Sequence, residues 1–135
     1  MKISTRGRYG LRLMIELAMN QDKGYISLNE IAKIQEVSEK YLEQLITPLS
    51  KAGLVMSQRG AQGGYRLAMD ADKISVGKIL VALEGSLSPV DCLENGACTK
   101  VDSCVSVFLW QKIKDAIDNV INTMTLEDLV NEKNI

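Results

Sequence analysis

Two short helical patterns joined by a tight turn constrain this sequence more than any other feature. Ser27 is a candidate N-cap for a helix over residues 28–35, and Glu30 completes the spacing of a capping box. After a turn at residues 36–37, Ser38 is a candidate N-cap for a second helix. Two short helices joined in this way, the second with a hydrogen-bonding outer face, predict a helix-turn-helix.

The second of these helices has two distinct faces. One face repeats apolar residues at the i, i+3, i+4, i+7 spacing and should be buried: Leu42, Leu45, Ile46 and Leu49. The other face repeats polar residues at the same spacing: Lys40, Glu43, Gln44 and Thr47. Pro48 lacks an N–H group, so we expect it to end or kink the helix near Thr47.

A glycine-rich hairpin follows the second helix. Gly53 is a helix stop, and residues 54–58 and 65–68 have the pattern of two strands. Three glycines within residues 59–64 supply the positive-φ positions of a hairpin tip. A hairpin directly after a helix-turn-helix predicts a winged helix, with Arg59 at the base of the wing.

Further helical patterns flank this motif. Residues 9–19 carry an apolar stripe at helical spacing, and Ser75 is a candidate cap for a helix over residues 76–83. A long helix over residues 103–124 contains apolar residues that step by 3, 4, 3, 4, as in the seam of a helix pair: Trp110, Ile113, Ile117, Val120 and Met124. A helix of about 20 residues spans about 30 Å, so we expect a second chain to cover it.

The fold class expected is mainly α with a small β-hairpin. Residues 1–84 form the winged helix-turn-helix domain, and residues 85–104 form a cysteine-bearing cluster loop. Residues 105–135 hold the dimerisation helix and a C-terminal turn that Thr125 caps. No uninterrupted apolar run follows the basic N-terminus, so we expect a cytoplasmic protein without a signal peptide or a membrane partner.

Charge is distributed unevenly along the chain. The net charge is -1, but residues 1–75 hold 11 basic and 8 acidic side chains, whereas residues 76–135 hold 5 and 9. Residues 1–14 hold four basic side chains and no acidic one. A basic front and an acidic back suit a DNA-facing half joined to a sensing or assembly half.

The polar helix face predicts contacts with double-stranded DNA. Gln44 can pair with adenine, Lys40 with guanine or phosphate, and Glu43 with cytosine N4. Arg59 on the wing suits a narrow minor groove. The N-cap Ser38 belongs to the same predicted contact set, and arginines near the N-terminus would neutralise phosphates: Arg6, Arg8 and Arg12. The alternative is a solvated polar face and a hairpin that bind nothing, which the combination of all these features disfavours.

Three evenly spaced cysteines form a second constellation. Cys92, Cys98 and Cys104 are separated by five residues each time, and these intervening residues are mostly polar. Disulfides are rare in the cytoplasm, so metal binding or redox sensing is favoured over three unremarkable thiols. Three thiolates suit an iron–sulfur cluster or zinc. Either needs a fourth ligand, and the chain has no histidine.

Motifs along almost the whole chain are familiar in this order: Lys2-Ile3-Ser4-Thr5-Arg6-Gly7-Arg8-Tyr9-Gly10, Tyr41-Leu42-Glu43-Gln44-Leu45, Gly53-Leu54-Val55, Arg59-Gly60, Gly63-Gly64-Tyr65, the cysteines and Thr125-Leu126-Glu127-Asp128-Leu129. Together they resemble the bacterial iron–sulfur cluster regulator superfamily of the IscR, NsrR and CymR type. The resemblance implies a homodimer that binds a dyad-symmetric operator, with the long helix at the dimer interface. It also implies that Cys92, Cys98 and Cys104 hold an iron–sulfur cluster, with [2Fe-2S] favoured over [4Fe-4S].

Two positions depart from the fourth ligands of this superfamily. IscR-like proteins use a histidine three residues after the last cysteine, where this chain has Val107. NsrR-like proteins use an aspartate near the N-terminus of the partner subunit, and the matching position here is Arg8. An exogenous thiol, water or one of several side chains must substitute: Glu94, Asp102, Ser103 or Ser106. The segments 83–85 and 88–90 resemble CymR-like repressors, which carry no cluster.

The sequence therefore predicts a DNA-binding regulator that senses through a cluster and controls iron–sulfur assembly or sulfur-metabolism genes. A cluster-free, thiol-responsive repressor of cysteine metabolism would keep the DNA binding and use the cysteines directly. An iron–sulfur carrier would need no DNA binding, and the predicted winged helix argues against it. We expect no enzyme activity, because the chain has no histidine, no recognisable carboxylate pair and no phosphate loop.

Overall fold

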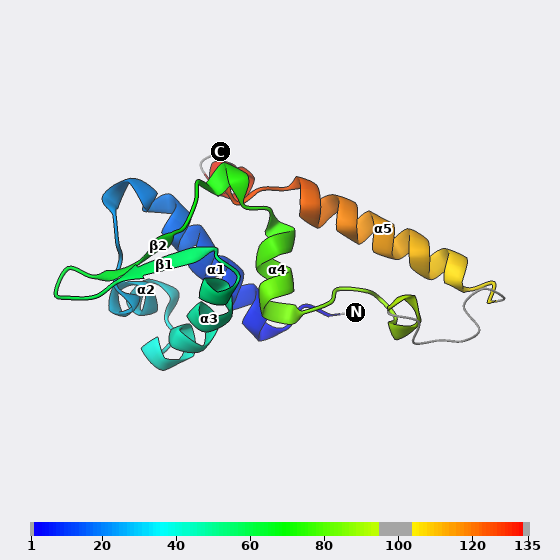
Figure 1. Ribbon diagram of the computed structural model, residues 1–135, viewed down its shortest axis with the longest axis horizontal. Coiled ribbons are helices and arrows are strands. Elements are labelled where there is room, and N and C mark those ends of the chain that lie inside the picture. The colour runs from blue at the N-terminus through cyan, green and yellow to red at the C-terminus, as the bar shows by residue number, and fades with distance from the viewer. Residues whose placement is uncertain (1, 95–103, 134–135) are drawn as a thin grey trace.

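A computed structural model describes residues 2–94 and 104–133, in which a helical body carries one long projecting helix (Figure 1). The elements in chain order are α1 (Thr5–Met19), α2 (Leu28–Gln35), α3 (Glu39–Lys51), β1 (Val55–Gln58), β2 (Gly64–Leu67), α4 (Val76–Glu84), α5 (Val107–Thr123) and α6 (Leu126–Lys133). Three short 3-10 turns lie between them, at Gln21–Lys23, Ala71–Lys73 and Asp91–Leu93. The expected fold class, mainly α with a β-hairpin, is confirmed.

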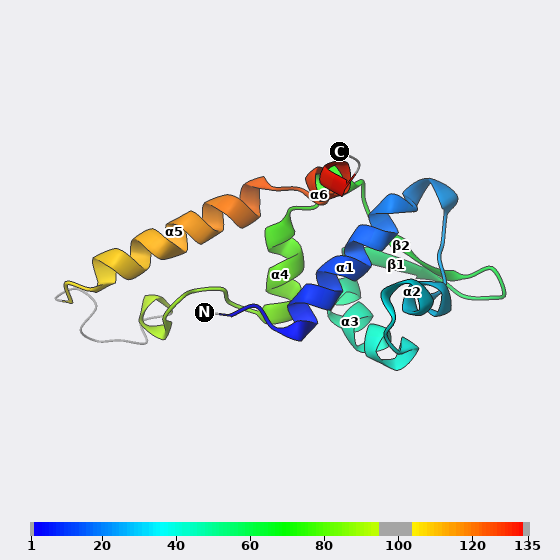
Figure 2. The same cartoon turned by 180° about the vertical axis from the view of Figure 1, so that it is seen from behind.

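The core lies around α1, which packs against α3, α4, α6 and β2. It is aliphatic, and its fully buried large side chains come from nearly every element of the body: Leu13, Met14, Leu17, Ile31, Leu42, Leu45, Leu49, Leu54, Ile74, Ile79 and Leu126. Burial of this apolar surface is the main favourable term that holds the short helices together. The helix α5 projects away from this body in both views (Figures 1 and 2).

The three N-caps predicted for the body helices are confirmed. Ser27, Ser38 and Ser75 each accept a hydrogen bond from the backbone N–H three residues ahead, at 3.2, 3.1 and 3.2 Å. Each bond satisfies one of the N–H groups that a helix start leaves unpaired. These local bonds explain why α2 and α3 begin where the sequence predicts.

The helical pattern predicted over residues 9–19 is confirmed, and α1 extends beyond it to begin at Thr5. Ser4 is its N-cap, and the Ser4 hydroxyl accepts from the N–H of Gly7 at 3.2 Å. The first turn holds glycine and arginine but no acidic residue, so it lacks the usual composition of a helix start. The cap and packing against α4 stabilise this turn.

The expectation that Pro48 ends the helix near Thr47 was wrong, because α3 continues to Lys51. Leu49 is fully buried, and the N–H of Ala52 donates to the carbonyl of Pro48 at 3.0 Å. A proline removes the donor for the carbonyl four residues earlier. That carbonyl belongs to Gln44 on the exposed face of α3, where water can satisfy it.

The C-terminal region differs from its expected outline in two ways. The long helix begins at Val107, and the expected C-terminal turn is the eight-residue helix α6. Thr125 and Asp128 form a reciprocal capping box, with bonds of 2.8 and 3.1 Å. α6 returns to α1, and Leu126 is fully buried in the core. α6 is therefore part of the body, whereas α5 and the segment that leads to the Asp91–Leu93 turn extend away from it (Figure 1).

Candidate functional site

The outward face of α3 is polar and open to solvent. Lys40, Glu43 and Gln44 are all exposed, while the apolar residues of the opposite face are buried as predicted. Ser38 lies at the exposed start of the same helix. One continuous strip of donors and acceptors is thus presented by a helix whose other side is fixed in the core.

The turn between α2 and α3 is held by a side-chain contact. The Asn29 amide of α2 donates to the Glu39 carboxylate of α3 at 2.6 Å. Glu36 ends α2 in the left-handed conformation, with φ 56°, which reverses the chain within a few residues. These contacts fix the angle between the two helices of the helix-turn-helix.

The wing is anchored to the helix-turn-helix by its strand β2. Tyr65 and Ile26 exchange two backbone hydrogen bonds of 2.8 and 2.9 Å. Gly64 has φ 150°, and a Cβ there would collide with the carbonyl of Ile26. Glycine is therefore required where β2 passes close to the segment before α2. Arg59 is exposed at the start of the tip, directly after β1.

A groove of about 510 Å³ separates the start of α3 from the wing. Glu39 and Glu43 line one side, and Gln58 and Arg59 line the other. The structure therefore brings Glu43 and Arg59, two of the predicted DNA-contacting residues, to one surface. Their role in DNA contact remains a prediction.

The N-terminal half of α1 lies beside the start of α3. The ring of Tyr9 meets that of Tyr41 edge-on, with centroids 6.0 Å apart. The Arg12 guanidinium lies 5.0 Å from the centre of the Tyr9 ring. Arg6 and Arg8 are exposed on the preceding turn, and Arg8 donates to the Thr5 hydroxyl at 3.2 Å. The predicted phosphate contacts thus lie on the helix next to α3.

The predicted cysteine site is only partly within the described residues. Cys92 is half-buried in a 3-10 turn, Cys104 is exposed just before α5, and Cys98 lies outside the described residues. The Cys104 sulfur lies 3.0 Å from the hydroxyl oxygen of Ser106. Hydrogen bonds with the Ser106 side chain and the backbone of Ser106 and Val107 lower the pKa of Cys104. The ionised thiolate is the form that binds metals and reacts with oxidants.

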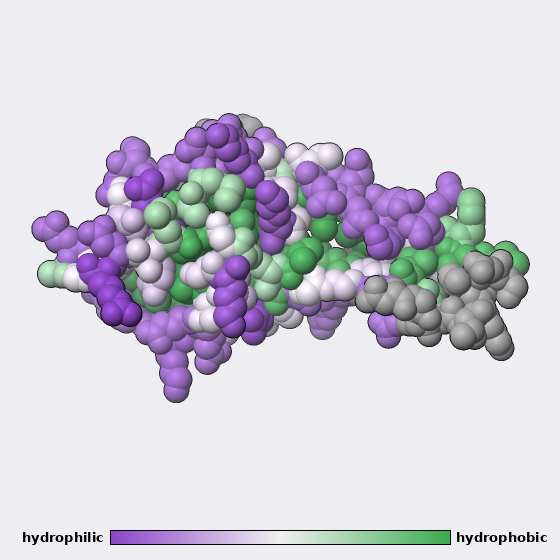
Figure 3. Space-filling view, in the orientation of Figure 1, coloured by the Kyte–Doolittle hydropathy of each residue, from purple (hydrophilic) through white to green (hydrophobic). Residues whose placement is uncertain are grey.

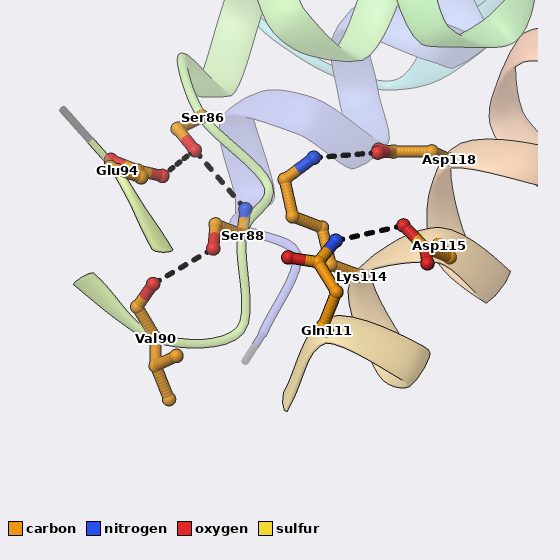
Figure 4. Close-up of polar contacts among 8 residues, drawn as sticks. All are labelled: Ser86, Ser88, Val90, Glu94, Gln111, Lys114, Asp115 and Asp118. Atoms are coloured by element: carbon orange, nitrogen blue, oxygen red, sulfur yellow. Dashed lines mark hydrogen bonds and ion pairs between the residues drawn. The ribbon is translucent and has the colours of Figure 1, made fainter. Parts of the chain in front are cut away.

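Hydrogen bonds join residues on both sides of Cys92 (Figure 4). The Ser86 hydroxyl donates to the Glu94 carboxylate, and the N–H of Ser88 donates to the Ser86 hydroxyl at 3.1 Å. The Ser88 hydroxyl donates to the carbonyl of Val90 at 2.8 Å. Within residues 2–94 and 104–133, three or more acidic or thiol side chains do not converge as a metal site.

The predicted fourth ligands fall into two groups. Asp102 and Ser103 lie outside the described residues. Glu94 and Ser106 are described, and each is already engaged, by Ser86 and by Cys104 respectively. Val107, where a histidine would stand in IscR-like proteins, is the first residue of α5.

A family model described as an iron-dependent transcriptional regulator, Rrf2, matches residues 3–132. The chain belongs to the Rrf2 family. It is 50% identical over 129 residues to the HTH-type transcriptional regulator CymR of Bacillus subtilis, across 96% of this chain and 89% of that protein. The resemblance that the motifs suggested is confirmed.

Two solved Rrf2-type structures have the same fold. One is the structure of CymR, the global cysteine regulator of B. subtilis, with TM-score 0.82 and 48% identity over 98% of both chains. The other is IscR of T. potens, with TM-score 0.80 and 43% identity over 98% of this chain and 88% of that one. The protein is accordingly a DNA-binding transcriptional regulator rather than an enzyme.

Sequence reasoning missed two contacts of this Rrf2 protein. One is the pairing of Tyr9 with Tyr41, and the other is the binding of Ser4 by Glu84. Both join residues far apart in the chain, so no local pattern predicts them.

Within the described ranges, no helix combines the length and the apolar character needed to cross a membrane.

Proposed function

We propose that two copies of this chain bind a dyad-symmetric operator, each inserting α3 into the major groove. The observation that carries this proposal is the exposed strip of Lys40, Glu43 and Gln44 beside the wing. Side chains of these types read base edges in the major groove. Arg59 enters the neighbouring minor groove, and Arg6 and Arg8 neutralise phosphates.

The second copy pairs along α5. Val107–Thr123 contains no buried residue, although this helix of 17 residues is about 25 Å long. Of the predicted seam, Ile113, Val120 and Met124 are exposed, whereas Trp110 and Ile117 are half-buried against the chain itself. Exposed apolar surface of this extent is typical of an interaction site.

An apolar groove beside α5 supports this pairing. It has a volume of about 420 Å³, and residues of the N-terminal segment and α4, including Ile3 and Leu80, face Ile117 and Val120 across it. Hydrophobic surface extends from the body along one edge of the projecting helix (Figure 3). A partner helix packed here would remove both the groove and the exposed stripe from water.

The three cysteines hold an iron–sulfur cluster, with [2Fe-2S] favoured over [4Fe-4S]. The two described thiols fit such a group, because Cys104 is exposed with a lowered pKa and Cys92 is only half-buried. The family's description as iron-dependent supports the same reading. When bound, the cluster would supply a redox-active centre held by thiolates. A regulator that senses through such a cluster would control genes of iron–sulfur assembly or sulfur metabolism.

Residues 85–104, which hold the three cysteines, link the DNA-binding body to the helix that we propose pairs with the second chain. This cysteine segment begins directly after α4 and ends at α5. The other end of α5 is fixed to the body, since Val76 donates to the carbonyl of Met124 and Leu126 to that of Ile74, both at 2.9 Å. Cluster binding by the cysteines of residues 85–104 would therefore shift α5 and the spacing of the two α3 helices, which must match the half-site spacing.

A second candidate function dispenses with the cluster. The lowered pKa and full exposure of Cys104 also suit a thiol that oxidants or persulfides modify directly. Identity of 50% with CymR of B. subtilis favours this reading, as does the description of that regulator as a global cysteine regulator. The chain would then repress cysteine-metabolism genes in response to thiol chemistry.

The test of DNA binding is selection of duplexes from a random pool by the full-length protein, purified without oxygen. We expect an enriched motif with two inverted half-sites about one helical turn apart, as two-fold symmetric helix-turn-helix dimers require. Gln44→Ala should lose preference at one base pair in each half-site. Enrichment of no motif, or of a motif without symmetry, would contradict the proposal.

A further inference from the structure

The carboxylate of Glu84, the last residue of α4, accepts two hydrogen bonds from Ser4, the residue directly before α1. The N–H of Ser4 donates to Oε2 at 3.3 Å, and the Ser4 hydroxyl donates to Oε1. The same hydroxyl accepts from the N–H of Gly7 at 3.2 Å. Ser4 therefore caps α1 and joins it to the end of α4 at once.

The packing of α1 on α4 is shaped around this carboxylate. A Cβ on Gly7 would collide with the Glu84 side chain, and a Cβ on Gly10 would collide with Leu83. Two glycines one turn apart thus let the helices approach closely where the carboxylate lies. Any larger residue at position 7 would displace either Glu84 or the first turn of α1.

The charges at this end of α1 explain why an acid is needed there. Cations are unfavourable at a helix N-terminus, which carries a partial positive charge. The first turn of α1 nevertheless holds Arg6 and Arg8 and has no acidic residue of its own. Glu84 supplies the missing negative charge from another helix. Local rules broken in this way are typical of functional sites.

We infer that Glu84 is a positioning residue for DNA binding, which through Ser4 holds the first turn of α1 so that Arg6 and Arg8 face the phosphates. This inference rests on the proposed DNA interface. Glu84 is also the last helical residue before the cysteine segment. The end of α4 that leads into the cysteines is therefore bonded directly to the turn that carries both arginines.

A positioning role and a simple charge effect predict opposite results. A carboxylate near the arginines repels DNA phosphates, so removal of its charge alone would tighten binding. Loss of the Ser4 contacts would instead free the first turn of α1 and weaken binding. The sign of the change in affinity thus separates the two explanations.

The experiment measures the dissociation constant of the full-length Glu84→Gln variant for the duplex selected by the wild type, over a range of salt concentrations. Glutamine keeps the shape of the side chain but removes its charge, and its NH2 group cannot accept a hydrogen bond from Ser4 as the second carboxylate oxygen does. We expect affinity to fall about 5- to 20-fold and the salt slope to fall by about 2, as when each protomer loses one phosphate contact.

A double-mutant cycle with Arg6→Ala and Arg8→Ala adds a second readout. If Glu84 acts through the arginines, Glu84→Gln should cost little further affinity once both are removed, since coupled residues are not additive. Ser4→Ala, which keeps the Ser4 N–H, should show a smaller effect in the same direction. Additive losses, or tighter binding by Glu84→Gln, would overturn the inference.

The matched control is Ser75→Ala, which removes an N-cap bond of 3.2 Å from α4, the same length as that of Ser4. This variant should lower the melting temperature but leave the salt slope unchanged, because no arginine depends on that cap. A wild type that selects no duplex would instead contradict the proposed DNA binding. The two failures are therefore distinguishable.

Discussion

The ring of Tyr9 on α1 meets the ring of Tyr41 on α3 edge-on, with centroids 6.0 Å apart and planes at 81°. This geometry is one of the favoured arrangements of aromatic pairs. It joins the helix that carries Arg6 and Arg8 to the first turns of the helix that carries Gln44. A direct side-chain contact therefore joins the helices that carry the phosphate-contacting and base-contacting parts of the proposed interface.

Tyr9→Leu should weaken both the fold and DNA binding. Loss of the aromatic pair should lower the free energy of unfolding by about 1 kcal/mol, and the start of α3 should lose its lateral support. Urea denaturation and operator titration measure the two effects. Tyr25→Leu is the control, because the Tyr25 ring lies 5.6 Å from the Arg66 guanidinium of β2 rather than in the pair that joins α1 to α3. Equal losses of DNA affinity in both variants would count against the account.

Gln44→Ala and Lys40→Ala should differ in how they change sequence preference. Removal of a base contact at Gln44 should cost about 1–3 kcal/mol on the preferred operator and relax specificity at that base pair. Lys40→Ala should weaken binding to all duplexes alike if Lys40 contacts phosphate, with a smaller salt slope. Titration of operator and single-base variants distinguishes these patterns. A Gln44 variant with unchanged specificity would place the base contacts elsewhere.

Much of the fold could be predicted because its signals are local. The serine caps of α2, α3 and α4 bond only three residues ahead, so Ser27, Ser38 and Ser75 mark the helix starts in the sequence itself. The glycine-rich tip of the wing is similarly local. The two faces of α3 followed from its helical spacing alone.

The differences from the expected outline arose where distant parts of the chain decide the outcome. α3 passes through Pro48 because burial of Leu49 outweighs the lost hydrogen bond. α1 begins at Thr5 because Ser4 and Glu84 stabilise a turn with poor helix-start composition. The predicted seam of α5 is only partly exposed, because Ile117 lines the groove between α5 and the body. A helical repeat shows which residues share a face but not which of them pack against their own chain.

Val120→Asp should dissociate the dimer without unfolding the protomer. Val120 is 55% exposed on the apolar side of α5, so a buried charge at the interface would be costly while the monomer keeps its core. Sedimentation velocity should show halved mass with an unchanged circular dichroism spectrum. Asn119→Asp, on the adjacent exposed position, is the control and should remain dimeric. A Val120 variant that is still dimeric would exclude this face as the interface.

Alkylation of Cys104 should depend on pH in a way set by Ser106. The hydrogen bonds from Ser106 lower the pKa of Cys104, so the reactive thiolate persists to lower pH and disappears only as pH falls through the lowered value. Ser106→Ala should raise that pKa and shift the rate profile with iodoacetamide to higher pH in metal-free protein. Mass spectrometry of the modified peptides measures the rates, with Cys92 as the internal control. Identical profiles would show that Ser106 does not activate this thiol.

The most direct test of the sensor is the content of iron and acid-labile sulfide per chain, measured on protein purified without oxygen. We predict about two of each per chain, with a brown chromophore, as a [2Fe-2S] centre requires. The Cys98→Ser variant should lose both. A wild type that stays colourless and metal-free after anaerobic reconstitution would contradict the cluster and leave a regulator that responds through its thiols.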